Sequence, residues 1–158
     1  MLDKFKSLPL RKGVGVILLN SKNKVFVAKR IDNPKNFWQM PQGGVDKNED
    51  FLSAAFRELK EETSIENVEL IKELEGMTTY ELPNNLLGII WKGKYRGQEQ
   101  KWFIMRFKGK ENEINLKTKH PEFLEWQWIE IDEITKYVVD FKLNIYQIIK
   151  DKVKKILN

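Results

Sequence analysis

The feature that most constrains this chain is a glycine pair, Gly43-Gly44, followed at short range by a helix rich in glutamate. Apolar residues recur at helical spacing after Asp50, and aspartate favours the position before a helix because its carboxylate accepts first-turn N–H groups. We expect the helix to begin near Phe51 and to end near Thr63. The chain must therefore place a glycine turn and an amphipathic helix close together.

Three glutamates share one face of that helix, because Glu58, Glu61 and Glu62 stand at i, i+3 and i+4. Like charges on one face repel unless something neutralises them. Hard divalent cations such as Mg²⁺ or Mn²⁺ take carboxylate oxygens and bridge them to phosphates. A solvated acidic face is the usual interpretation of such a helix alone. The glycine turn, Glu49 and Arg57 make this combination too specific for that interpretation.

Cysteine and histidine content excludes several kinds of catalytic site. The chain has no cysteine and a single histidine, His120. A disulfide, a thiol nucleophile and a Cys zinc site are therefore excluded, and a Ser-His-Asp or Cys-His centre is nearly excluded. Carboxylates must carry any acid–base chemistry.

Length, hydrophobic content and net charge indicate the broad class of protein. A length of 158 residues with 41% hydrophobic content predicts one globular domain over residues 1–158. No window approaches the roughly 20 apolar residues of a membrane span, and residues 1–13 lack the apolar core of a signal peptide, so a cytoplasmic protein is expected. The net charge of +5 favours anionic partners such as phosphates or nucleic acid, without identifying one.

Hydrophobic patterning predicts strands interleaved with helices, and hence an α/β fold. The predicted strands cover residues 13–19, 24–30, 68–74, 77–82, 100–107 and 125–131. A short helix is predicted over 132–139 and an amphipathic helix over 143–156, whereas 86–93 fits either a strand or a structured loop. Four tryptophans are expected in the core: Trp38, Trp102, Trp126 and Trp128.

The spacing of the glycine turn and the acidic helix resembles the Nudix box, G-x5-E-x7-R-E-U-x-E-E-x-G-U, in which U is apolar. The matching residues are Gly43, Glu49, Arg57, Glu58, Leu59, Glu61, Glu62 and Ile65. One position departs, because Ser64 stands where the family has a glycine that favours positive φ. The resemblance implies an α/β/α sandwich with a mixed β-sheet, and hydrolysis of a nucleoside diphosphate linked to another moiety.

Segments outside the box resemble one branch of the family, which holds RNA 5′-pyrophosphohydrolases and related dinucleoside polyphosphate hydrolases. They are WQMPQGG at 38–44, GQEQKWF at 97–103, PEF with two tryptophans at 121–128, VVDFK at 138–142, and Arg11 with the GVG run at 13–15. The resemblance therefore covers essentially the whole chain.

The resemblance also implies roles for individual residues. Two or more Mg²⁺ or Mn²⁺ ions would be bound by Glu58, Glu61, Glu62 and Glu122. Arg57 would orient the glutamates, Glu49 would pair with that framework, and either Glu58 or Glu62 would take the proton of the attacking water. Arg30 and Lys101 would reach the phosphates, and the first base would be framed by Arg11, Val139 and Phe141. The Phe141 ring could equally pack in the core.

Several functions fit these residues. The leading hypothesis is hydrolysis of the 5′-triphosphate end of RNA to a 5′-monophosphate with release of pyrophosphate, which initiates mRNA decay. The alternative is hydrolysis of dinucleoside polyphosphates such as diadenosine tetraphosphate or pentaphosphate. A non-catalytic binding module is disfavoured because every box carboxylate is present, and an enzyme that removes damaged mononucleotides is disfavoured by the WQMPQ run.

Overall fold

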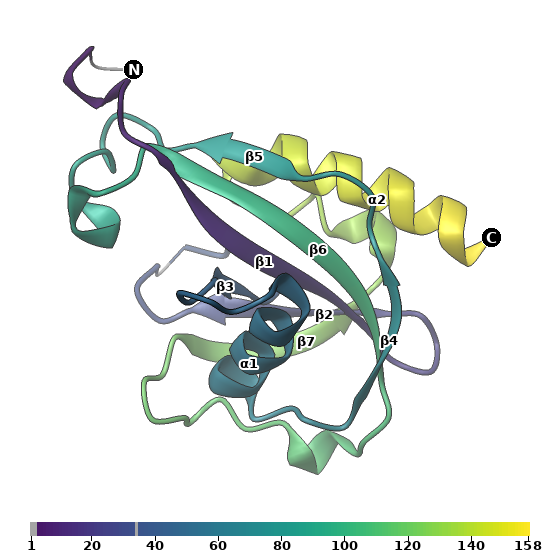
Figure 1. Cartoon of the computed structure of the whole chain (residues 1–158). Helices are drawn as coiled ribbons and strands as arrows, with labels where there is room; N and C mark the ends of the chain where they lie inside the picture. Colours follow the sequence, from purple (N-terminus) through teal and green to yellow (C-terminus); the bar gives the residue numbers. More distant parts are fainter. Residues whose placement is uncertain (1–2, 34) are drawn as a thin grey trace.

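Strand β1 (Leu10–Leu19) lies at the centre of the sheet in this computed structural model, which describes residues 3–33 and 35–158. It pairs in parallel with β6 (Gly97–Phe107) and antiparallel with β2 (Val25–Arg30). Strands β4 (Val68–Glu73) and β7 (Phe123–Ile129) complete the order β4-β6-β1-β2-β7. The sheet is therefore mixed, as predicted (Figure 1).

The two helices cover opposite faces of this sheet (Figure 1). Side chains alternate along a strand, so Val16 of β1 joins the core under α1 (Phe51–Thr63), whereas Ile17 joins the core under α2 (Leu143–Leu157). Residues 13–19 are all buried, which explains their near-continuous apolar run. The predicted α/β/α arrangement is confirmed.

Helix α1 has the bounds that the sequence predicts. The carboxylate of Asp50 accepts a hydrogen bond from the Ser53 N–H at 2.7 Å, which caps the first turn. Leu59 is buried against the sheet, and Ser64 follows the last turn in the left-handed conformation. Within residues 3–33 and 35–158, no helix has the length and apolar character that crossing a membrane requires.

The segment of residues 39–44 lies between β1 and β2. Gln39 pairs with Ala28 of β2, whereas β3 (Gln42–Gly44) pairs with β1 at Gly13–Gly15. These backbone bonds hold the glycine turn at the sheet, directly before the loop that leads into α1. The sheet thus sets the position of the turn relative to the acidic helix.

Two segments differ from the predicted secondary structure. The predicted helix at 132–139 is wrong, because only a 3-10 turn forms at Ile131–Glu133. Eight residues offer too few hydrogen bonds to offset the cost of helix nucleation. The segment 86–93, for which strand and loop stayed open, consists of turns that end in a 3-10 helix at Ile90–Gly93.

Several strand boundaries also move, and β1 begins at Leu10, three residues before the predicted start at Gly13. β6 begins at Gly97, three residues before the predicted start at Gln100, because its first residues bond to β1 on one side and to β5 (Thr78–Glu81) on the other. β7 begins at Phe123 and ends at Ile129, two residues earlier than predicted at both ends. Pairing with neighbouring strands, rather than apolar alternation, determines where these strands start.

The tryptophans occupy the core and its margin. Trp102 is buried, as predicted, but Trp126, Trp128 and Trp38 are half-buried. The rings of Trp126 and Trp128 each lie 5.7 Å from the ring of Phe26, so both project from the same face of β7. The core expectation is therefore right for Trp102 and only partly right for the other three.

Candidate active site

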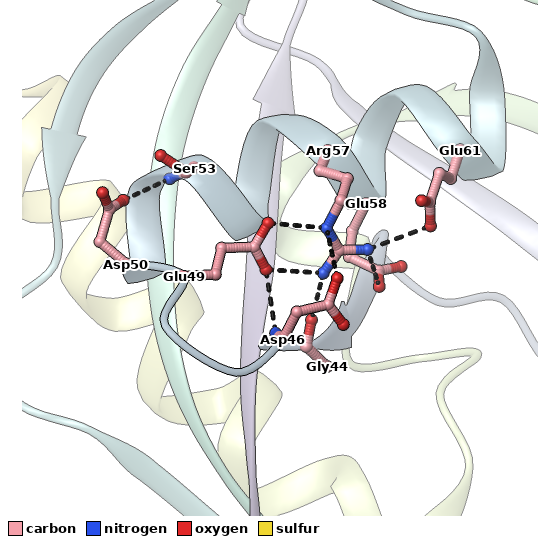
Figure 2. A network of polar contacts seen from close by, with 8 residues as sticks. All are labelled: Gly44, Asp46, Glu49, Asp50, Ser53, Arg57, Glu58 and Glu61. Carbon is pink, nitrogen blue, oxygen red and sulfur yellow. Dashed lines mark hydrogen bonds and ion pairs between the residues drawn. The ribbon is translucent and has the colours of Figure 1, made fainter.

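Arg57 joins the loop before α1 to the acidic face of the helix (Figure 2). Its Nε and Nη2 donate to the two carboxylate oxygens of Glu49 at 2.8 and 2.9 Å, and Nη2 also donates to the Gly44 carbonyl at 2.8 Å. Its Nη1 donates to Glu58 at 2.9 Å and to Glu61 at 3.1 Å. The planar guanidinium thus holds four acceptor groups in fixed directions.

Glu49 is the carboxylate that accepts two hydrogen bonds from Arg57. Its side chain accepts the two Arg57 hydrogen bonds and a further one from the Asp46 N–H at 3.0 Å. The Arg57 hydrogen bonds first, and the Asp46 N–H second, lower the pKa of Glu49 to about 2. Glu49 therefore stays ionised, as the partner of a permanently charged arginine must be.

The glycine pair leaves room for two side chains. A Cβ on Gly43 would lie 2.0 Å from the carboxyl carbon of Glu58. A Cβ on Gly44 would lie 2.4 Å from Nη2 of Arg11. Close approach, rather than an unusual φ, is why this turn requires glycine.

Glu62 combines burial with an unpaired carboxylate oxygen. Its side chain is buried at 3% exposure, and its Oε2 has no hydrogen-bond partner among the described residues. Burial first, and then the charges of Glu122 and Glu58, raise the pKa of Glu62 well above its ordinary range. Burial also raises the pKa of Glu58. A buried carboxylate oxygen without a hydrogen-bond partner is unfavourable, and a bound cation would stabilise it.

Glu122 reaches this group from a distant part of the sequence. It precedes β7, and its carbonyl accepts a hydrogen bond from the Ile31 N–H at 2.9 Å. Pairing of β7 with β2 brings the exposed Glu122 side chain to Glu62. We call Glu58, Glu62 and Glu122 the carboxylate group.

The carboxylate group fits a hard divalent cation. It offers oxygen donors, which Mg²⁺ and Mn²⁺ prefer, and one of these oxygens is buried and unpaired. Within the described ranges, no three acidic or histidine side chains already enclose a common point. Glu58 and Glu61 each give one oxygen to Arg57, which leaves the second oxygen of each for a cation.

Two cationic side chains face the carboxylate group. Arg30 makes a bidentate pair with Asp32 at 2.8 Å, and the charges of Glu122 and Glu62 also act on it. Lys142 is buried, and burial first and Arg30 second lower the pKa of Lys142 to about 7. Lys142 was not among the predicted site residues, although it ends the VVDFK run, and that run was the available signal for it.

Two of the residues expected to frame a base, Arg11 and Phe141, are linked by contacts through buried side chains. Arg11 donates to Gln98 at 3.2 Å, and its guanidinium carbon lies 5.1 Å from the Trp91 ring centre. The Tyr80 hydroxyl lies 3.4 Å from the same Gln98 oxygen, and its ring centre is 5.6 Å from that of Phe141. Phe141 is half-buried, so it both packs on the core and leaves part of its ring accessible.

Val139 and Lys101 are placed differently. Val139 is half-buried and precedes the 3-10 turn at Asp140–Lys142, where its carbonyl accepts the Lys142 N–H at 3.0 Å. Lys101 donates to the Gly76 carbonyl at 3.2 Å and pairs with Glu73 at 3.7 Å. The structure thus brings Val139 beside Phe141, but engages Lys101 with the turn between β4 and β5.

A cavity of about 300 Å³ opens beside Glu58. Its lining combines cationic, acidic and aromatic side chains: Leu10, Arg11, Lys12, Gly44, Val45, Asp46, Glu58 and Tyr95. The cavity therefore has both Arg11 and Glu58 in its wall.

Known proteins are similar to this chain in sequence and in fold. An RNA pyrophosphohydrolase of Pelagibacter ubique is 72% identical over 158 residues, which is 100% of both chains. An RNA pyrophosphohydrolase of Roseobacter denitrificans is 47% identical over 151 residues and covers 94% of each chain.

Solved structures agree on the fold. The dihydroneopterin triphosphate pyrophosphohydrolase of E. coli has a TM-score of 0.68 at 20% identity, with 87% of this chain and 94% of that chain covered. An Ap4A hydrolase of C. elegans has a TM-score of 0.64 at 19% identity, with 92% and 97% covered. The family model described as the NUDIX domain matches residues 9–149, and the chain therefore belongs to the Nudix family.

Proposed function

We propose that this protein is an RNA pyrophosphohydrolase, which hydrolyses the 5′-triphosphate end of RNA to a 5′-monophosphate, releases pyrophosphate and so initiates mRNA decay. The observation that carries this choice of substrate is the 72% identity, over the whole chain, to a relative named RNA pyrophosphohydrolase. In this proposal residues 1–158 form one catalytic unit, which works in the cytoplasm, where its RNA substrate would be found. The Ap4A hydrolases among the solved structures share only the fold at this level of identity.

The carboxylate group and Glu61 would hold two or more Mg²⁺ or Mn²⁺ ions. A cation held there would neutralise phosphate oxygens and make the attacking water more acidic. Arg57 and Glu49 keep Glu58 and Glu61 in place through the hydrogen bonds described above. Their contribution is to fix the donor oxygens before substrate arrives.

The reaction breaks one phosphoanhydride bond with water. Either Glu58 or Glu62 accepts the proton of the water, whose oxygen becomes bonded to phosphorus as pyrophosphate leaves. Arg30 and Lys142 face the carboxylate group and would bind phosphate oxygens, which offsets the charge that develops on them. Arg11, Val139 and Phe141 would frame the first base, where stacking on an aromatic ring is worth roughly 1–3 kcal/mol.

We expect triphosphorylated RNA to be the better substrate in a direct comparison. Turnover of a short 5′-triphosphate RNA and of diadenosine tetraphosphate should be measured at equal enzyme and Mg²⁺ concentrations. The proposal requires kcat/KM to be at least about tenfold higher for the RNA, a difference of about 1.4 kcal/mol. Rapid cleavage of the dinucleotide while the RNA keeps its triphosphate would show that the alternative substrate is correct.

Substitution of Gly43 by alanine should weaken metal-dependent turnover without unfolding the protein. The new Cβ would occupy the position of the Glu58 carboxyl, which lies at the end of a flexible side chain and must move. We expect about a tenfold loss of kcat and a higher Mg²⁺ concentration at half-maximal rate. Gly109→Ala is a matched control, since its Cβ would approach Glu113 at 2.5 Å, outside the site. Equal Mg²⁺ dependence in Gly43→Ala and the parent would contradict the proposed role of Glu58.

A further inference from the structure

Ser64 occupies a backbone conformation that favours glycine. It follows the last turn of α1 with φ 68° and ψ 5°, in the left-handed region where a Cβ is disfavoured. Its N–H donates to the Lys60 carbonyl at 2.8 Å, as the residue that ends a helix often does. A glycine would satisfy this backbone geometry with less strain. What serine adds at this position is a hydroxyl group.

That hydroxyl ties a distant loop to the end of the helix. Ser64 Oγ donates to the Asn115 carbonyl at 2.8 Å, across 51 positions of sequence. Beside it, the Asn115 N–H donates to the Thr63 carbonyl at 2.9 Å. Ile114 is buried in the core under α1, so the loop is anchored next to these bonds. We call residues 115–122, which lead from this anchor to β7, the Glu122 loop.

The Glu122 loop carries a member of the carboxylate group at its far end. Glu122 lies beside Glu62, which is only two residues before Ser64 on α1. The loop is attached to the rest of the fold on both sides of this carboxylate. β-pairing supplies one attachment after Glu122, and the end of α1 supplies the other.

We propose that Ser64 is a positioning residue, whose hydrogen bond to Asn115 holds the Glu122 loop so that Glu122 stays beside Glu62 to bind a divalent cation. This inference rests on the cation-binding role proposed above for the carboxylate group. Ser64 acts through Glu122 and touches neither the cation nor the substrate.

Ser64→Gly separates this role from that of a simple helix end. The substitution relieves the left-handed strain, so the temperature of unfolding should stay the same or rise. Loss of one hydrogen bond should weaken Mn²⁺ binding about fivefold, measured by titration of the protein without RNA. Amide hydrogen exchange of residues 116–122 should become faster. A residue that only ends the helix would leave Mn²⁺ affinity and this exchange unchanged, and that result would overturn the proposal.

Two further variants sharpen the test. Asparagine tolerates the left-handed region and carries an amide donor, so Ser64→Asn should recover part of the Mn²⁺ affinity. Glu66→Gln is the matched control, because Glu66 is exposed, pairs with Lys60 at 3.5 Å and lies outside the Glu122 loop. It should leave both measurements unchanged. Because neither measurement uses RNA, a failure of the RNA proposal would not alter their outcome.

Discussion

Glu62→Gln should nearly abolish hydrolysis and yet leave the protein at least as stable as the parent. Glu62 is buried, its Oε2 lacks a partner, and two nearby carboxylates repel it. The neutral amide removes that repulsion but donates where a cation needs an oxygen anion. We expect kcat to fall on the order of 10³-fold, about 4 kcal/mol of activation free energy. Single-turnover rates and denaturant unfolding without metal would measure the two effects.

The same substitution should also change how the stability of the protein depends on pH. Since the pKa of Glu62 is raised above its ordinary 4.5, the folded protein keeps a proton that the unfolded chain has released. Stability from this group is therefore greatest in acid and falls as pH rises from about 4.5 through the raised pKa. Glu62→Gln should remove that fall. Glu69→Gln, an exposed residue that pairs with Lys108 at 3.9 Å, should leave it unchanged. A Glu62→Gln protein that turns over at the parental rate would refute the metal role.

Local spacing predicts the part of the site that lies within one loop and one helix. Glu58, Glu61 and Glu62 share a face because helical geometry requires it. The pairing of Arg57 with Glu49, which the family resemblance implied, also lies within this short segment, since eight positions of sequence separate the two residues. Interactions of this kind depend on local backbone geometry.

Contacts between distant segments depend on the sheet, and spacing alone does not predict them. Glu122 lies beside Glu62 because β7 pairs with β2. The family resemblance implied a metal-binding role for Glu122, but it did not specify this pairing, and neither did periodicity. Lys101 was expected to reach the phosphates, but the register of β6 against its neighbours places its side chain where it donates to the Gly76 carbonyl. The burial of Lys142 was not predicted, since its motif indicates a role but not its surroundings. Tertiary packing decides these three cases.

Arg57→Lys should cost about 100-fold in kcat and about 2 kcal/mol of unfolding free energy. A single ammonium cannot reach Glu49, Gly44, Glu58 and Glu61 in the directions that the guanidinium does. Glu58 and Glu61 would then adopt positions that no longer suit a shared cation. Initial rates across an Mg²⁺ titration and denaturant unfolding at pH 7 are the measurements.

The acid side of the stability profile tests whether the loss passes through Glu49. Arg57 lowers the pKa of Glu49 to about 2, so this stabilisation is complete above about 4.5 and is lost as pH falls toward 2. The stability difference between Arg57→Lys and the parent should therefore be largest near neutral pH and shrink in acid. Arg96→Lys, which alters an arginine that pairs with Glu81 at 3.2 Å outside the site, should change turnover little. If Arg57→Lys were destabilised but kept its rate at saturating Mg²⁺, Arg57 would support the fold without orienting the glutamates.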